Sequence, residues 1–145
     1  MTHRVERSAL VDYSDRQMFD LVNDIEAYPE YMSDCVGAQV LRRGDDWLEA
    51  RLELQKAGVS QSFVTYNRLE PPHRMTMSLV DGPFSHLEGC WSFEPINDNA
   101  CRVSLELEFE MRNRLLGMAV GKFFESAASH QVDALCARAR QMYGV

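Results

Sequence analysis

Hydrophobic residues recur in this chain with two different periods, one after the other. Between residues 36 and 111 apolar side chains alternate with polar ones, as in WLEARLELQ (residues 47–55) and RVSLELEFEM (residues 102–111). A period of two is typical of antiparallel strands with one buried and one solvated face. Turn-forming residues divide this region into about six strands, with breaks at Gly44-Asp45-Asp46, Gly58, Pro71-Pro72, Asp81-Gly82-Pro83 and Asn97-Asp98-Asn99.

The period becomes helical after Met111. Apolar residues then recur at steps of four and three, which places them on one stripe of a helix from about Arg114 to Tyr143. Such a helix would be about 45 Å long, enough to cross a whole sheet. The stripe consists of Phe124, Ala128, Val132, Leu135, Ala139 and Met142, and it is widened by Val120, Phe123 and Ala127.

The N-terminal segment predicts a strand followed by two short helical elements. VERSALVDY (residues 5–13) begins as a strand, and Ser14 is a candidate N-cap whose hydroxyl accepts from the free amides of a first helical turn. Pro29 makes continuation of this helix past Tyr28 unfavourable. A second short helix or turn is therefore expected over IEAYPEYM, residues 25–32.

The apolar face of the sheet and the apolar stripe of the helix can each be buried only by packing against another element. We therefore expect one α+β domain over residues 1–145, in which a curved antiparallel sheet of about seven strands wraps around the long C-terminal helix. The space left between them should be lined by apolar side chains. For any one candidate taken singly, filling of the core is the favoured interpretation. The candidates are Phe63, Met75, Met77, Trp91, Phe93, Val120, Phe123, Phe124 and Ala127.

Composition narrows the class of function. The chain is 46% hydrophobic and 26% charged, which is typical of a globular protein, and its net charge of −7 argues against non-specific attraction to DNA or anionic membranes. No signal-peptide pattern and no apolar run of about 20 residues is present, so we expect a cytoplasmic protein without a membrane segment. The four cysteines form no C-x-x-C pair and are expected to be free thiols.

SHLEGCWSF (residues 85–93) contains the most reactive side chains, with His86, Glu88 and Cys90 at alternate positions. His-x-Glu also occurs in zinc deaminases, but those enzymes need a P-C-x-x-C ligand pair that this chain lacks. In a strand these three residues share one side, whereas Leu87 and Trp91 share the other. We therefore interpret them as the solvated face of a strand and expect no metal site.

Two further features could indicate catalysis. GMAVGKF (residues 117–123) has three residues between its glycines and Phe123 after the lysine, so it does not match a phosphate-binding P-loop. Glycines four apart in a helix instead allow close backbone approach or leave room for a ligand. His130 is the histidine most able to project inward, but no nucleophile partner is identifiable from spacing. We expect no catalytic residue, no cofactor and no enzymatic activity.

Four stretches resemble a known family over nearly the whole chain: LVNDIEAYPEYMSDC, KAGVSQSFVTYN, LVDGPFSHLEGCWSFEP and the tail ARARQMYGV. The chain resembles the START-like, helix-grip superfamily labelled polyketide cyclase/dehydrase, in the branch of the ribosome association toxins (RatA) and coenzyme Q-binding proteins. The family elements fall on Tyr28-Pro29-x-Tyr31, on Gly82-Pro83-Phe84, and on Leu87, Trp91 and Phe93. The chain departs from the family at Met32-Ser33-Asp34, where a second proline is usual.

The resemblance implies a binding protein. Relatives in this branch bind the large ribosomal subunit and hinder subunit association, or hold a ubiquinone-like lipid. An apolar cavity suits ubiquinone or another isoprenoid lipid, with Tyr28 and Tyr31 offering hydroxyls at its mouth or, equally, anchoring the helical turn to the sheet. A carrier or chaperone of ubiquinone is the alternative function, and a polyketide cyclase/dehydrase-like enzyme is the third.

Ribosome binding requires positive charge on an acidic protein. The candidate residues form three pairs, each of which could also be ordinary solvated surface: Arg42 and Arg43, Arg112 and Arg114, and Arg138 and Arg140.

Overall fold

The computed structural model describes residues 2–56 and 58–144, with the backbone alone at positions 114 and 116. Seven antiparallel strands form one sheet in the order β1-β7-β6-β5-β4-β3-β2. The elements are β1 (Thr2–Val11), α1 (Asp15–Asn23), the 3₁₀ helix η1 (Ile25–Glu30), β2 (Cys35–Arg43), β3 (Trp47–Lys56), β4 (Val59–Glu70), β5 (Arg74–Asp81), β6 (Phe84–Asn97), β7 (Ala100–Met111) and α2 (Arg114–Tyr143).

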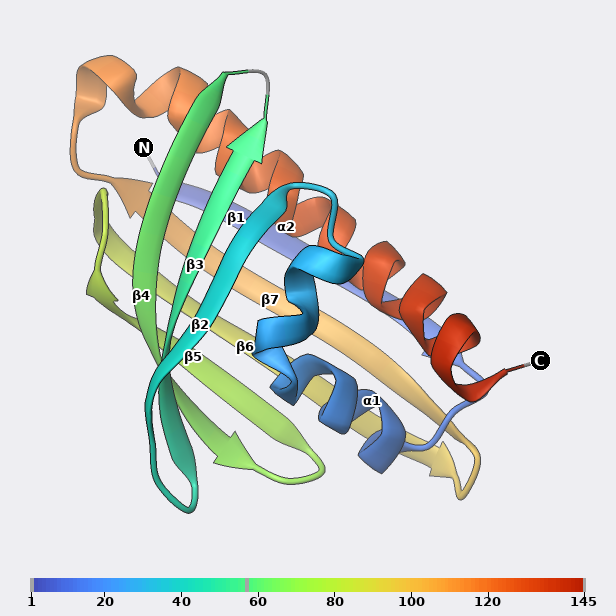
Figure 1. The fold of residues 1–145 in the computed structure, drawn as a ribbon. Coiled ribbons are helices and arrows are strands. Elements are labelled where there is room, and N and C mark those ends of the chain that lie inside the picture. The colour runs from blue at the N-terminus through green and yellow to red at the C-terminus, as the bar shows by residue number, and fades with distance from the viewer. Residues whose placement is uncertain (1, 57, 145) are drawn as a thin grey trace.

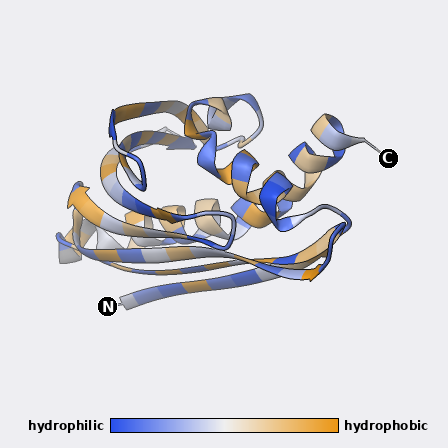
Figure 2. Ribbon diagram, turned by 90° about the horizontal axis from the view of Figure 1, so that it is seen from below, coloured by the Kyte–Doolittle hydropathy of each residue, from blue (hydrophilic) through white to orange (hydrophobic). Residues whose placement is uncertain are grey.

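The sheet curves around α2, which runs alongside β1 and β7, while α1 and η1 cover another part of the same face (Figure 1). The predicted seven-stranded helix-grip architecture, with two short helices after the first strand, is confirmed. Hydrophobic and hydrophilic residues alternate along the strands (Figure 2), as the period of two requires. Of the described helices, none is long and apolar enough to cross a membrane.

Capping interactions set the start of α1 at the predicted position. The Ser14 hydroxyl accepts from the Gln17 amide at 3.1 Å, and the Gln17 side chain accepts from the Ser14 amide at 2.9 Å. This reciprocal pair is a capping box, which satisfies two amides that a helix N-terminus otherwise leaves free. The prediction that Ser14 is the N-cap is confirmed.

The expected solvated face of β6 is confirmed. Leu87, Trp91 and Phe93 are buried, whereas Glu88 is exposed and His86 lies 4.0 Å from a carboxylate oxygen of Glu108 on the outer face of β7. Among the described residues, no group of three or more His, Cys, Asp or Glu side chains could hold a metal ion.

The apolar stripe of α2 faces the sheet as predicted from Phe124 to Ala139, but Met142 is 56% exposed. The helix is held at this end by its neighbour Tyr143, whose ring lies 5.7 Å from that of Tyr13 and whose hydroxyl donates to the carbonyl of Gln17. At this end the contacts with the rest of the fold are made by Tyr143 and by the carbonyl of Gly144, which accepts from the Tyr13 hydroxyl, while Met142 points to solvent. Its inclusion in the buried stripe was wrong.

Gly121 allows the close approach that the sequence suggested. A Cβ atom built at this position would lie 2.4 Å from Nε2 of His3, so a larger residue would overlap the imidazole. His3 itself, on β1, is 9% exposed, stacks on Phe109 at 4.9 Å and contacts Glu125 of α2 at 3.2 Å. The helix therefore lies directly on this edge of the sheet.

Candidate ligand-binding cavity

A cavity lies between α2 and the inner face of the sheet, as the fold predicted. Its volume is about 60 Å³. Its wall is mainly apolar, with polar groups at Tyr28, Thr65, Asn67 and Gln131. The other lining residues are Ile25, Ala50, Leu52, Leu54, Phe63, Met77, Phe84, Leu87, Trp91, Leu105, Leu107, Phe109, Phe124 and Ala128.

Four phenylalanines from different elements form one wall. Phe84 of β6 lies 4.7 Å from Phe124 of α2 and 5.7 Å from Phe109 of β7, measured between ring centroids. Phe63 of β4 contacts Phe124 at 5.6 Å in an edge-to-face arrangement. Such pairs add directional attraction to the burial of large apolar surface. The cluster joins α2 to β4 on one side of the sheet and to β6 and β7 on the other.

The structure places five of the predicted lining residues on this cavity: Tyr28, Phe63, Met77, Trp91 and Phe124. Phe63, Met77, Trp91 and Phe124 lie on the faces that the alternation or the helical stripe assigned to them, and Tyr28 comes from the family element.

The other six predicted lining residues do not line the cavity: Tyr31, Met75, Phe93, Val120, Phe123 and Ala127. Phe93 is covered by α1, since its ring meets that of Phe19 at 5.8 Å. Met75 is fully buried beside Asn67, and α2 lines the cavity with Phe124, Ala128 and Gln131 in place of the three predicted helix residues. Facing inward is therefore not the same as reaching the empty space.

Gln131 of α2 was missed as a lining residue, and so were two polar residues of β4, Thr65 and Asn67. They are 5% and 3% exposed, and the Thr65 hydroxyl donates to the amide oxygen of Asn67 at 2.8 Å. The alternation that turns Phe63 inward carries both residues inward as well, so the signal was present in the strand pattern. The search for apolar lining residues passed over them.

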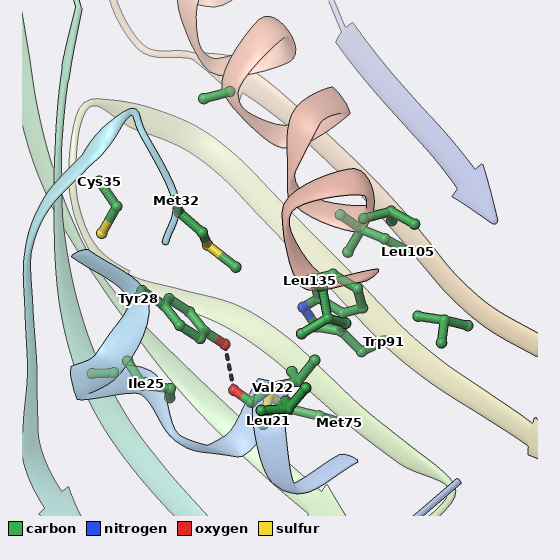
Figure 3. Packing of buried hydrophobic residues seen from close by; sticks show 14 of the residues in the cluster. Leu21, Val22, Ile25, Tyr28, Met32, Cys35, Met75, Trp91, Leu105 and Leu135 are labelled. Carbon is green, nitrogen blue, oxygen red and sulfur yellow. Dashed lines mark hydrogen bonds between the residues drawn. The ribbon is translucent and has the colours of Figure 1, made fainter. Parts of the chain in front are cut away.

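The two tyrosines of the Tyr-Pro-x-Tyr element contact other parts of the fold. The Tyr28 hydroxyl donates to the carbonyl of Val22 at the end of α1 (Figure 3), and burial raises the pKa of Tyr28 well above its usual value. Burial also raises the pKa of Tyr31, against the opposing effect of the Arg138 guanidinium. That guanidinium lies 5.1 Å from the centre of the Tyr31 ring. Of the two roles expected for Tyr28, a hydroxyl facing a ligand or an anchor of the helical turn, the structure shows an anchor, which ties η1 to α1.

A shallower pocket of about 30 Å³ opens beside the cavity, between α2 and the segment from Met32 to Cys35. Leu54 and Gln131 line both spaces and therefore stand between them. The Met32-Ser33-Asp34 departure from the family pattern lies on the wall of this pocket. Ala127 and His130 lie on its opposite wall, and His130 is exposed rather than directed into the cavity.

The family model described as polyketide cyclase/dehydrase and lipid transport matches residues 11–136. The chain belongs to this family. It is 45% identical over 141 residues to the ribosome association toxin RatA of Vibrio cholerae, which covers 97% of this chain and 98% of that protein. It is 27% identical over 141 residues to the mitochondrial coenzyme Q-binding protein COQ10 homolog B of Xenopus laevis, covering 94% and 58% of the two chains.

Solved structures agree with this membership of the polyketide cyclase/dehydrase and lipid transport family. A START superfamily protein from Mycobacterium smegmatis superposes with a TM-score of 0.80 at 25% identity, covering 97% and 99% of the two chains. The Zhui aromatase/cyclase of a Streptomyces species superposes with a TM-score of 0.88 at 15% identity over the full length of both chains. The second likeness shows the fold alone. The START-like resemblance seen in the sequence is confirmed.

Two of the arginines expected to meet a partner are held by carboxylates. Arg42 donates from Nε to Glu49 at 3.3 Å, and Arg138 donates to Glu30 at 3.2 Å while its guanidinium lies over Tyr31. Their charge is partly compensated within this START-like fold.

The remaining arginines are more available. Arg112 donates to the backbone carbonyls of Gly82 and Phe84, which do not neutralise its charge. Arg43 and Arg140 are exposed, and the side chain of Arg114 lies outside the described residues. The end of β2 and the two ends of α2, which carry these pairs, lie at separate corners of the molecule (Figure 1). The three pairs therefore do not form one basic patch.

Proposed function

We propose that this protein is a cytoplasmic, non-enzymatic binding protein that binds the large ribosomal subunit and hinders subunit association. The observation that carries the proposal is the 45% identity to a protein named ribosome association toxin, over nearly all of both chains. Identity at this level over the full length makes a shared partner more plausible than a shared fold alone does.

The contact surface that we propose lies at the start of α2. Arg112 keeps its charge there, Lys122 is exposed two turns along the helix, and Leu115 and Met118 are 94% and 66% exposed. Positive charge favours ribosomal RNA, and exposed apolar side chains gain from being covered by a partner. An otherwise acidic protein needs such a local surface to approach the ribosome.

Sedimentation of purified subunits tests this proposal. Subunits are mixed with the protein, shifted to magnesium concentrations that favour reassociation, and separated on a gradient. We expect loss of the 70S peak and cosedimentation of the protein with the large subunit. Arg112→Gln with Arg114→Gln should weaken both effects, because glutamine carries no charge.

Arg42→Gln with Arg43→Gln is the matched control, because it removes the same charge at a distant corner of the fold and should leave inhibition intact. Equal loss in both double variants would contradict the proposed surface. An unchanged 70S peak with the wild-type protein would contradict the ribosomal function itself.

A second function is supported by the cavity, namely the carriage of ubiquinone or another isoprenoid lipid. The apolar lining and the similarity to a protein named coenzyme Q-binding both favour a neutral apolar ligand. Lipid extraction and mass spectrometry of the purified protein test it. Absence of any apolar molecule after gentle purification, with no Trp91 fluorescence change on adding ubiquinone, would count against it.

An enzyme of the cyclase type is the third possibility and has the least support. Acid and base groups would have to converge in the cavity. The described lining residues include no carboxyl, imidazole, amine or guanidinium group.

A further inference from the structure

Asn67 is a buried amide on the wall of an otherwise apolar cavity. It lies on β4, and its side chain is 3% exposed and lines the cavity. An amide buried among apolar side chains is unfavourable unless its hydrogen bonds are made. The hydrogen bonds of Asn67 therefore indicate what the cavity is built to accept.

Thr65 fixes the orientation of this amide. Its hydroxyl donates to Oδ1 of Asn67 at 2.8 Å, which turns Nδ2 toward Met75, whose Sδ lies 3.6 Å away. The reversed amide would place Oδ1 against the thioether sulfur, which has no hydrogen to donate. The orientation with Nδ2 toward Met75 is therefore favoured.

Nδ2 carries two hydrogens, and only one can point at Met75. Thioether sulfur is a weak acceptor, and the second N–H has no acceptor among the described residues. One N–H of Asn67, held in place by Thr65, is therefore left as a donor on the wall of a mainly apolar cavity.

We propose that the cavity ligand is a neutral molecule whose carbonyl oxygen accepts a hydrogen bond from Nδ2 of Asn67, with the rest of the ligand apolar. The inference rests on the proposed apolar ligand and specifies its chemical class. A carbonyl suits a mainly apolar wall on which this N–H is left without a partner. A fatty-acid carboxylate would also accept, but burying its charge needs a cation, and the described lining residues provide none.

The size of the cavity bears on how such a ligand enters. About 60 Å³ holds a carbonyl head or a few waters, whereas sites for drug-sized ligands are about 300–1,000 Å³. Phe63 of β4 meets Phe124 of α2 in the aromatic wall at 5.6 Å, so separation of these rings would widen the cavity. A ring-bearing ligand such as a quinone requires this movement.

Two probes of different head-group chemistry test the proposal in the Trp47→Phe variant, where Trp91 on the cavity wall is the one remaining tryptophan. Ubiquinone-2 carries carbonyl oxygens and is followed by quenching of Trp91. Diphenylhexatriene is a hydrocarbon without an acceptor and is followed by its own fluorescence. Asn67→Leu removes the donor at similar size, and Thr65→Val leaves the amide but removes the hydroxyl that orients it.

We expect Asn67→Leu to weaken ubiquinone-2 at least about tenfold and to leave diphenylhexatriene unchanged or tighter. Thr65→Val should weaken ubiquinone-2 about threefold, and it decides the question if Asn67→Leu does not fold. Equal ubiquinone-2 affinity in the Trp47→Phe protein and in its folded Asn67→Leu and Thr65→Val derivatives would overturn the role of Asn67. Wild-type binding of diphenylhexatriene alone would overturn the carbonyl class only. Binding of neither probe would overturn the apolar-ligand function and this inference together.

Discussion

Gly121 and Gly117 allow the packing of α2 on the sheet to be tested with one substitution at two places. Replacing a helical glycine by alanine ordinarily stabilises a protein by about 1 kcal/mol, because alanine loses less backbone entropy. At Gly117 the new Cβ would lie 3.5 Å from Cβ of Met111, an ordinary contact. We therefore expect Gly117→Ala to stabilise the fold by up to about 1 kcal/mol.

At Gly121 the same methyl group would lie 2.4 Å from Nε2 of His3. The imidazole cannot easily move away, because it stacks on Phe109 and contacts Glu125. Overpacking of this kind costs about 1–3 kcal/mol. After subtracting the gain in helix propensity, Gly121→Ala should be neutral to destabilising by about 2 kcal/mol, so the two variants should differ by about 1–3 kcal/mol.

Urea unfolding of both variants, and of each in a His3→Ala background, measures these values. Without the imidazole, Gly121→Ala should become stabilising, whereas the effect of Gly117→Ala should not change. If Gly121→Ala stabilises the wild-type background as much as Gly117→Ala does, the close contact between α2 and β1 is wrong. An unfolding slope that changes between variants would mean that the denatured state also responds.

Three further predictions concern stability. Leu135→Ala should cost about 2–5 kcal/mol in thermal or urea unfolding because Leu135 is fully buried, whereas Leu115→Ala, at a position 94% exposed, should change stability by no more than about 0.5 kcal/mol. Ser14→Ala should cost about 1 kcal/mol, and no loss would mean that the capping box contributes nothing. Burial raises the pKa of Cys101 from 9.0 to about 11, so the folded state keeps this proton longer than the unfolded state. Its stabilising effect is complete below pH 9 and is lost as the pH rises through 11, and Cys101→Val should flatten urea-unfolding stability across that window.

The strands and the helix could be predicted because the hydrophobic period within each segment shows which of its faces is buried. Alternation over residues 36–111 needs no knowledge of the partner to predict strands, and the steps of three and four after Met111 predict the helix in the same way. The predicted helix from Arg114 to Tyr143 has the observed bounds. Met142 shows the limit of this reasoning, since a periodic pattern cannot tell where the surface beneath a helix ends.

The cavity could be predicted to exist but not to have its observed outline. Phe93 and Trp91 lie on the same face of β6, yet only Trp91 reaches the empty space because α1 covers Phe93 through Phe19. Which inward side chain meets a void depends on how the helices are placed over the sheet, and this is a property of the assembled fold. Asn67 was overlooked for a different reason, because polar residues on a dry face are exceptional and must be sought individually.

The two tyrosines of the Tyr-Pro-x-Tyr family element are not the residues best suited to recognise a ligand. Tyr28 is bonded to Val22, Tyr31 lies beneath Arg138, and these contacts tie η1 to α1 and to α2. They shape the fold in any member that keeps them, whatever it binds. Asn67 ties no helix to the rest of the fold, because its two partners lie on its own strand and on the adjacent one. Change at Asn67 can therefore alter the ligand while leaving the architecture intact, which makes it the position where relatives with different ligands should differ.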